Sequence, residues 1–329
     1  MSRRSIGRIV IERNGGPEVL QWKTTELGEP GPNEVRVRHT AIGVNFIDVY
    51  FRTGMYAGTG FPMSLGREAA GVVEEVGSSV TEFRVGDRVA YGFAPPGAYA
   101  EARLIDAEQL VGLPDGIEDD VAAAIMLKGM TAEYLLHRTY AVRAGDDVLV
   151  HAAAGGVGLL LCQWAKQLGA RVIGAVGNDE KAALARSHGA ADTIVYTREN
   201  IAERVRALTS GMGVRVVYDS VGKDAFAASL DSLGTRGMLA LFGQASGKVP
   251  PLDLQVLNAK GSLFVTRPSL GHYVGTRPEL LESARRLFAV VTDGSVKPNI
   301  GHRYALEDVA RAHAELEARR TTGSTILLP

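Results

Sequence analysis

The pattern of apolar and polar positions changes near Asp119. Before it, short β-branched or alternating segments separated by Gly and Pro predict strands at residues 8–11, 34–39, 71–76, 88–91 and 98–102. After it, apolar runs alternate with segments of helical period. This order predicts an α/β protein, with a compact barrel-like β domain followed by a doubly wound domain around a parallel sheet.

The second half of the chain contains six short apolar runs that predict strands, at residues 147–151, 171–176, 192–196, 214–218, 237–242 and 263–266. Segments of helical period precede or separate them, at residues 121–136, 159–169, 201–208, 224–230 and 252–257. The tail predicts helices at 278–292 and 306–319 and a strand at 324–328. We expect a tail of this length to fold back onto the first domain.

Residues 147–176 read as one strand–helix–strand unit with a glycine-rich turn after the first strand. In such a unit the turn lies at a helix N-terminus and can hold a dinucleotide pyrophosphate. Gly155 would let the backbone approach the phosphates, and Gly158 would let the helix pack on the strand. Because Ala153 stands where the usual fingerprint has its first glycine, an ordinary tight turn is the alternative.

Charge and cysteine content narrow the class of protein. The 36 Lys and Arg residues against 37 Asp and Glu give a formal net charge of −1, so a surface for nucleic acid is not expected. No run of about 18 apolar residues predicts a membrane span. The single cysteine, Cys162, cannot form an internal disulfide, which favours a cytoplasmic location.

Seven motifs in order along the chain resemble those of the medium-chain dehydrogenase/reductases, in particular the zinc-free quinone oxidoreductases (zeta-crystallin-like) and among them the bacterial NADPH:quinone oxidoreductases. They are residues 43–48 (GVNFID), 66–71 (GREAAG), 86–89 (GDRV), 128–131 (KGMT), 151–158 (HAAAGGVG), 218–221 (YDSV) and 266–270 (TRPSL). The resemblance implies a GroES-like catalytic domain at residues 1–124, a Rossmann domain at 125–267, and a C-terminal segment, 268–329, that completes the catalytic domain.

The resemblance also implies that no metal is bound. Zinc-dependent relatives carry a cysteine where this chain has Asn45 and a histidine where it has Arg67. A catalytic zinc needs three protein ligands and an open position, and one cysteine with scattered histidines does not supply them. Without zinc to polarise an alcohol, an acceptor that takes hydride readily, such as a quinone, becomes the expected substrate.

By the same resemblance, the acceptor lies near the nicotinamide in the cleft between the domains. Asn45, Tyr50 and Arg52 are the candidate catalytic residues, with the Asn45 amide and the Tyr50 hydroxyl as donors to the acceptor oxygen. Lys128 and Thr131 line the nicotinamide side. The alternative for Asn45, Tyr50 and Arg52 is a purely structural role.

The cofactor is expected to be NADPH. Val176 ends the second strand of the unit, where an NAD enzyme carries an acid, and a 2′-phosphate gains from nearby cations. Lys181, Tyr196 and Arg319 match the family's 2′-phosphate contacts. Asp179 could instead bind the ribose of NADH, but it falls past the strand end, in the first turn of the next helix.

The remaining cofactor contacts also come from the resemblance. It assigns Gly155, Gly156 and Val157 to the pyrophosphate, and it places Ser220, Phe242, Ser246 and Arg267 along the cofactor groove. Ser220 and Phe242 are expected just beyond strand ends, where ligands bind open α/β sheets. Core packing is the alternative for Phe242.

Three functions are compatible with these residues. The first is an NADPH-dependent quinone oxidoreductase, and the second is an NADPH-dependent reductase of activated alkenes or carbonyls such as enones and alkenals. The third is a non-catalytic NADPH-binding protein or a protein that binds AU-rich RNA, against which the near-neutral charge argues. The family pairs its last Rossmann strand across a two-fold axis, so residues 263–266 predict a homodimer.

Overall fold

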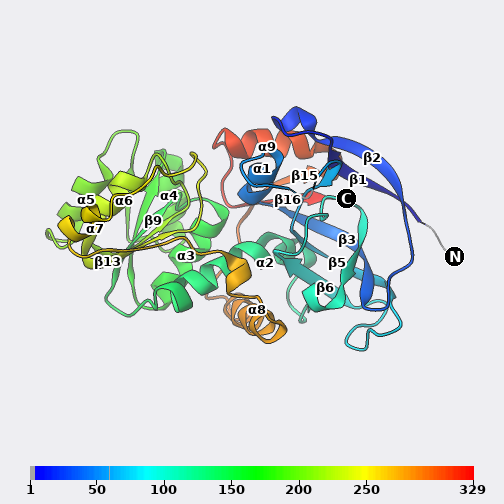
Figure 1. Cartoon of the computed structure of the whole chain (residues 1–329). Helices are drawn as coiled ribbons and strands as arrows, with labels where there is room; N and C mark the ends of the chain where they lie inside the picture. Colours follow the sequence, from blue (N-terminus) through cyan, green and yellow to red (C-terminus); the bar gives the residue numbers. More distant parts are fainter. Residues whose placement is uncertain (1–3, 59) are drawn as a thin grey trace. The chain divides into compact units, whose positions relative to one another are not determined.

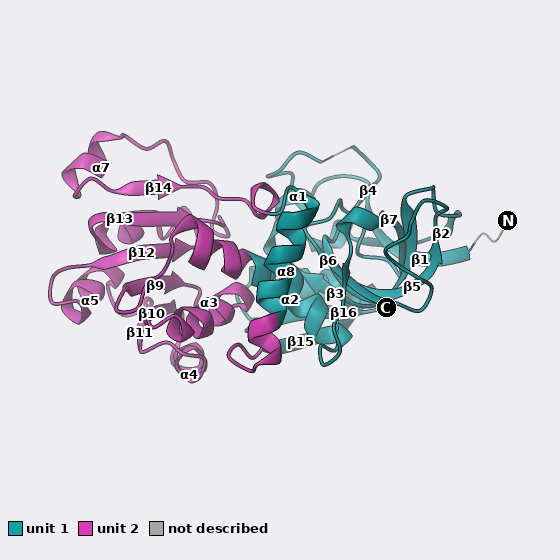
Figure 2. Cartoon of the chain, turned by 90° about the horizontal axis from the view of Figure 1, so that it is seen from below, with its two compact units in different colours: residues 1–130, 274–288, 298–329 teal, residues 131–273, 289–297 magenta. Residues whose placement is uncertain are grey.

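The computed structural model describes residues 4–58 and 60–329 and contains two compact units (Figure 2). Unit 1 comprises the described part of residues 1–130 together with residues 274–288 and 298–329. Unit 2 comprises residues 131–273 and 289–297. Each unit is described separately here, and the domain boundaries expected from the sequence stay predictions.

Unit 1 is built on a seven-stranded sheet and a three-stranded sheet (Figure 1). The large sheet has the order β15-β16-β3-β5-β6-β8, with β7 also paired to β3, and the small one has the order β2-β1-β4. The strands are β1 (Arg4–Ile11), β2 (Gln21–Leu27), β3 (Glu34–Val44), β4 (Met63–Ser64), β5 (Glu68–Val76), β6 (Arg88–Gly92), β7 (Ala102–Asp106), β8 (Val111–Gly112), β15 (Ile300–Ala305) and β16 (Ser324–Leu328).

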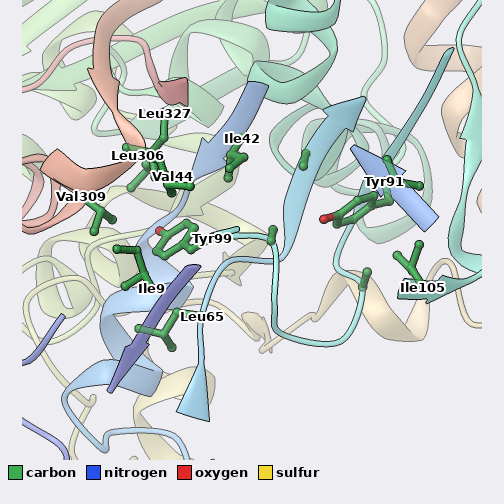
Figure 3. Close-up of a cluster of buried hydrophobic side chains, with 14 of the residues drawn as sticks. Ile9, Ile42, Val44, Leu65, Tyr91, Tyr99, Ile105, Leu306, Val309 and Leu327 are labelled. Carbon is green, nitrogen blue, oxygen red and sulfur yellow. The ribbon is translucent and has the colours of Figure 1, made fainter. Parts of the chain in front are cut away.

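The tail of the chain completes the core of unit 1, as expected. Strand β16 pairs antiparallel with β3, with Ile326 opposite Gly43. Leu306, Val309 and Leu327 then pack in one apolar cluster with side chains from the first half, among them Ile9, Ile42, Val44, Leu65, Tyr91, Tyr99 and Ile105 (Figure 3). Burial of this shared surface, and not chain continuity, holds the tail in place.

Unit 2 is the expected doubly wound sheet, with six parallel strands in the order β11-β10-β9-β12-β13-β14. Its strands are β9 (Asp147–His151), β10 (Arg171–Val176), β11 (Asp192–Val195), β12 (Val214–Asp219), β13 (Leu233–Leu241) and β14 (Phe264–Thr266). The strand order reverses between β9 and β12, which is the position where such sheets bind ligands beyond the carboxyl ends of the strands.

Nine helices and several short turns connect the strands in the described residues. The helices are α1 (Phe46–Arg52), α2 (Asp119–Tyr134), α3 (Gly156–Gln167), α4 (Asp179–Ser187), α5 (Ile201–Leu208), α6 (Phe226–Ser232), α7 (Gln255–Ala259), α8 (Arg277–Thr292) and α9 (Val309–Glu317). The short turns are η1 (Pro17–Val19), η2 (Ala107–Gln109), η3 (Leu135–Thr139), η4 (Leu270–His272) and η5 (Leu306–Asp308).

The strand expected at residues 98–102 is wrong, because this segment divides its hydrogen bonds among several neighbours. Tyr99 donates its N–H to the carbonyl of Leu65, while its own carbonyl accepts from Ile9. Only Ala100 bridges to Arg8, and the regular strand starts at Ala102. The sequence pattern reflects burial, and residues 98–100 and 102 are buried here although the segment does not pair along a single neighbouring strand.

Two histidines buried in unit 1, His39 and His313, are neutral. His39 accepts from the Tyr91 hydroxyl at 2.8 Å and donates from Nδ1 to the Ala100 carbonyl at 2.6 Å, which assigns the proton to Nδ1. Burial lowers the pKa of His39 to about 4 and that of His313 to about 3. The unfolded chain therefore binds protons below pH 6.5 that the folded chain does not.

We predict a loss of stability in acid that runs through His39. As pH falls from 7 to 5, protonation of the unfolded state should remove about 2 kcal/mol from the free energy of unfolding for this one side chain. Between pH 7 and 5, the free energy of unfolding of the variant His39→Gln should therefore fall by about 2 kcal/mol less than that of wild type. Urea unfolding at each pH measures this difference. His272→Gln is the control, because His272 is exposed. An equal acid loss in His39→Gln and wild type would contradict the prediction.

Candidate functional site

The first part of the site lies at the start of α1, where Asn45 is the residue that precedes the helix. Its backbone N–H donates to Oδ2 of Asp48 at 3.0 Å, which fixes the entry of the chain into the helix. Its side-chain Nδ2 donates to Oε2 of Glu68 at 2.8 Å. Because Asn45 is 5% exposed and held on both sides, its amide has a fixed orientation.

Glu68 is the anchor of this region, and its role was not foreseen from the sequence. Its carboxylate is fully buried and accepts from Lys128 Nζ at 2.8 Å and from the Leu127 N–H at 2.7 Å, besides Asn45. A Cβ on Gly43 would lie 2.1 Å from the same carboxylate, so only glycine fits there. The signal available in the sequence was a charged residue directly before an apolar run, residues 69–73.

A second set of hydrogen bonds connects α1 with Tyr99 and with His313 of α9. The Tyr99 hydroxyl donates to Oδ2 of Asp48 at 2.9 Å and lies 3.0 Å from Nε2 of His313. Arg52 Nη1 donates to Nδ1 of His313 at 3.2 Å, which leaves the histidine proton on Nε2, facing Tyr99. Burial raises the pKa of Asp48 to about 6, and the bond from Tyr99 offsets part of that shift.

The expected catalytic residues therefore differ in their surroundings. Arg52 is fully buried and donates to His313, to the Gly15 carbonyl and to Glu317, the last at 2.6 Å. Its guanidinium is thus occupied in joining α1 to α9. Tyr50 is 6% exposed and packs its ring 5.1 Å from Tyr56 and 5.5 Å from Phe46, between ring centres.

The residues at the position of a catalytic zinc do not suit a metal. The resemblance puts Asn45 and Arg67 where zinc-dependent relatives carry ligands, and neither an amide held by a carboxylate nor a guanidinium is a zinc ligand. Cys162 lies buried on α3, where burial raises the pKa of its thiol to about 12. Across residues 4–58 and 60–329, no three His, Cys, Asp or Glu side chains converge as a metal-binding group.

The glycine-rich turn of unit 2 has the shape that the sequence predicts. Ala152 has a φ of 49°, and Gly155 precedes α3, which begins at Gly156. A Cβ on Gly158 would lie 2.3 Å from the Ala152 carbonyl oxygen, so the helix can pack this close only with glycine. The free N–H groups at Gly156 and Val157 then end at the carboxyl edge of the sheet, where they suit an anion.

Loops after β12 and β13 lie at the same edge of the sheet. Ser220 and Phe242 directly follow these two neighbouring strands, as expected, and the Phe242 N–H donates to the Asp219 carbonyl at 2.9 Å. The Ser246 hydroxyl donates to the Val221 carbonyl at 2.7 Å and so ties the two loops together.

Asp219, the last residue of β12, fixes the loop that follows this strand. Its Oδ1 accepts from the N–H groups of Val221 and Gly222, and its Oδ2 accepts from the Ser229 hydroxyl at 2.8 Å. Ser229 also lies 3.0 Å from Nε2 of His151, whose pKa burial lowers. The sequence did not single out this Asp219–Ser229–His151 cluster, which positions Ser220.

The end of β10 lacks a free acid. Val176 is buried, and Asn178 caps α4 by accepting from the Lys181 N–H at 2.9 Å. A Cβ on Gly177 would lie 3.0 Å from the Tyr196 hydroxyl, so Tyr196 sits over the chain that leads from β10 into α4. Lys181 and Tyr196 therefore lie in one region.

Asp179 is the first residue of α4, past the strand end as expected. Arg198 binds its carboxylate through two hydrogen bonds, of 2.7 and 2.5 Å. This contact lowers the pKa of Asp179, so the carboxylate is ionised and already paired. Arg198 was not singled out from the sequence.

The other expected cofactor residues are divided between the units. Thr131 is 6% exposed in unit 2, and Arg267 directly follows β14. Lys128 belongs to unit 1, as do the three expected catalytic residues. Arg319 also belongs to unit 1, where it follows α9 with a φ of 58°.

Comparison with known proteins agrees with this arrangement. Residues 31–143 match the family model of the alcohol dehydrogenase GroES-like domain, and residues 156–288 match that of the zinc-binding dehydrogenases. The chain is 56% identical to a quinone oxidoreductase of Pseudomonas aeruginosa over 98% of its own length and 99% of the relative's. It is 48% identical to a 2-haloacrylate reductase of a Burkholderia species, over 97% and 98% of the two chains.

A solved structure gives the same result. The crystal structure of Escherichia coli quinone oxidoreductase complexed with NADPH matches with a TM-score of 0.96 and 47% identity, covering 98% of this chain and all of that one. The family expected from the seven motifs is thereby confirmed. The chain belongs to the quinone oxidoreductases of the medium-chain dehydrogenase/reductase superfamily.

Proposed function

We propose that this protein reduces quinones with NADPH and without a metal ion. The observation that carries the proposal is the fixed amide of Asn45, held by the buried Glu68–Lys128 pair at the position where zinc-dependent relatives have a metal ligand. A preorganised donor stabilises the negative charge that develops on an acceptor oxygen. A quinone needs only such a donor, because it takes up hydride without activation by a metal.

The residues of unit 2 fit NADPH. The glycine-rich turn leaves room for the pyrophosphate. Lys181 and Tyr196 lie beyond β10, which ends in Val176 and not in an acid, and the carboxylate of Asp179 in the following helix is paired with Arg198. Bound NADPH supplies the hydride. We assign the pyrophosphate to Gly155, Gly156 and Val157, the 2′-phosphate to Lys181, Tyr196 and Arg319, and the rest of the cofactor to Lys128, Thr131, Ser220, Phe242, Ser246 and Arg267.

The residues of unit 1 would orient the acceptor. A primary amide nitrogen carries two hydrogens. In Asn45 one of them is hydrogen-bonded to Glu68, and we assign the second as a donor to the acceptor oxygen. We assign the Tyr50 hydroxyl as the second donor. Arg52 acts through α1, because its guanidinium is bound to His313, Gly15 and Glu317 and so fixes the helix that carries Tyr50.

Reduction of activated alkenes or carbonyls is the second candidate function. The relative named 2-haloacrylate reductase, 48% identical over nearly the whole chain, favours it. The same two donors would serve an enone oxygen as well as a quinone oxygen.

We further propose a cytoplasmic homodimer. Strand β14 pairs only with β13 among the described strands and carries two exposed apolar side chains, Phe264 at 57% and Val265 at 36%. An apolar edge strand of this kind is suited to pairing with a second copy. The single buried cysteine supports the location, and no helix in the described residues has the length and apolarity to cross a membrane.

The donor assignment predicts the effect of Asn45→Ala on turnover. The variant should lower kcat/KM for a quinone about 100-fold, measured as NADPH consumption with a chelator present, because one preorganised donor is lost. NADPH affinity should stay within about threefold, since the amide is assigned to the acceptor. Asn33→Ala in an exposed turn is the control. Unchanged quinone turnover would refute the assignment, and a wild type that is silent with quinones but reduces enones would favour the second function.

The Asp179–Arg198 pair predicts a change in cofactor preference. Arg198→Ala should leave a free carboxylate near the 2′-phosphate and weaken NADPH binding about threefold to tenfold, with little effect on NADH. Asp179→Ala in the same chain should restore NADPH affinity. Fluorescence titration of both nucleotides measures this, with Arg204→Ala as control because Arg204, which is exposed, forms an ion pair with the partly buried Glu199. Equal losses for NADPH and NADH would count against the idea.

The dimer proposal predicts that Phe264→Asp yields a monomer. A charge on the apolar edge would have to be buried against the second copy. Light scattering at micromolar concentration measures the mass, and Leu254→Asp is the control because Leu254 is exposed outside the strand. A monomeric wild type would remove the proposal.

A further inference from the structure

Asp48 is a buried carboxyl group that the reaction described so far does not use. It is 1% exposed and lies in the first turn of α1, three residues after Asn45. Its Oδ2 accepts two hydrogen bonds, from the Asn45 N–H at 3.0 Å and from the Tyr99 hydroxyl at 2.9 Å. Its Oδ1 is buried without a partner among the residues that the structure describes. One oxygen of Asp48 therefore holds the residue from which α1 begins.

The hydrogen bonds that lead to Asp48 all run in one direction. Arg52 donates to Nδ1 of His313 at 3.2 Å, which leaves the histidine proton on Nε2, 3.0 Å from the Tyr99 oxygen. Tyr99 thus accepts from His313 and donates to Asp48. Because each of these groups donates to the next, the series needs a strong acceptor at its end. An ionised carboxylate at Asp48 meets that need.

A proton on Asp48 would disturb this arrangement on either oxygen. On Oδ2 it would displace one of the two hydrogen bonds, because both lone pairs of that oxygen are in use. On Oδ1 it would be a buried donor with no acceptor in the described part of the chain. The neutral acid also accepts more weakly than the carboxylate does. Protonation therefore loosens the contact between Asp48 and the Asn45 N–H.

The charges around Asp48 favour its ionised form without neutralising it. Arg67 and Lys128 act on it through space, and Lys128 is itself paired with Glu68 at 2.8 Å. Burial outweighs these cations and the bond from Tyr99, and it raises the pKa of Asp48 to about 6. The charged or titratable side chains in these surroundings are Arg52 of α1, Arg67 before β5, Glu68 of β5, Tyr99 before β7, Lys128 of α2, and His313 and Glu317 of α9.

Ionised Asp48 makes the folded chain less stable. The pKa of the carboxyl is about 6 in the folded state against an ordinary value of 3.8, so near pH 5 the folded chain binds a proton that the unfolded chain does not. The contribution of this group to stability is therefore greatest in acid and declines as pH rises through 6. A buried carboxyl kept ionised at neutral pH against this cost is typical of a functional group.

We propose that Asp48 is a positioning residue for quinone reduction, which as a carboxylate holds the start of α1 and so aligns the Asn45 amide and the Tyr50 hydroxyl with the acceptor. This inference rests on the proposed function and adds a pH dependence to it. Protonation of Asp48 releases Asn45 from one of its two restraints, while the bond from its side chain to Glu68 stays. Quinone turnover therefore declines on the acid side, and the assigned NADPH contacts of unit 2 are untouched.

The first test is the pH profile of kcat/KM for 1,4-benzoquinone, measured on the full-length protein at saturating NADPH between pH 5 and 8. In wild type, kcat/KM should fall about tenfold from the plateau to pH 5, with an apparent pKa of about 6. In Asp48→Asn, which cannot ionise, kcat/KM at pH 8 should be about 10- to 100-fold below wild type, because the donors are misplaced. Its profile should be flat, and its Kd for NADPH at pH 8 should stay within about threefold of wild type.

A second variant tests the series of donors without changing the carboxyl group. Tyr99→Phe keeps the ring and removes the hydroxyl whose bond lowers the pKa of Asp48. The acid limb should therefore move to higher pH by about one to two units. Tyr91→Phe is the matched control, because Tyr91 is an equally buried tyrosine of the same core whose hydroxyl bonds to His39 and not to Asp48. Its acid limb should coincide with that of wild type.

The outcomes are distinct. A wild-type profile without an acid limb, or a limb that survives in Asp48→Asn, would assign the titration elsewhere and overturn the inference. An acid limb that stays in place in Tyr99→Phe would overturn it too, as would a loss of NADPH affinity in Asp48→Asn as large as its loss of turnover, which would show a general structural role. A wild type that reduces no quinone at any pH would instead refute the proposed function.

Discussion

The structure of the acceptor region depends on one buried carboxylate. Glu68 is fully enclosed and is stabilised there only because Lys128, the Leu127 N–H and the Asn45 amide all donate to it. Removing one partner from such a group typically costs about 3–5 kcal/mol, because a charge is left buried without compensation. The same bonds connect β5 to α2 and to the start of α1. The hydrogen bonds to Glu68 thus orient the Asn45 amide and also join three segments of unit 1.

This arrangement also suits the metal-free reduction that we propose. In the zinc-dependent branch, a cation at this position would polarise the substrate oxygen directly. Here the positive charge belongs to Lys128 and is paired with Glu68, so the donor that we propose for the substrate oxygen is an amide and not a Lewis acid. The acceptor must therefore be electrophilic on its own, which matches the quinone oxidoreductases among the relatives.

The sequence predicted the fold well and the site unevenly, for physical reasons. The six parallel strands of unit 2 were predictable because each is a short apolar run between helical segments, and β16 because residues 324–328 form a similar short run. The segment 98–102 was not, because Tyr99 and its neighbours are buried while bonding to separate strands. Glu68, Arg198 and Asp219 were missed because their roles come from partners distant in sequence. Arg52 shows the converse, since motif position alone cannot reveal that its guanidinium is bound to His313 and Glu317.

The pairing of β16 with β3 has a consequence for synthesis on the ribosome. Residues 324–328 fill a place in a sheet whose other strands begin at Glu34, so this sheet stays incomplete until almost the whole chain has been translated. Residues 131–273, by contrast, contain all six strands of the other sheet in one continuous stretch. Unit 2 can therefore fold co-translationally, while the large sheet of unit 1 keeps an open edge until β16 has been made. Nascent chains of this protein would thus be expected to need protection at that edge before release.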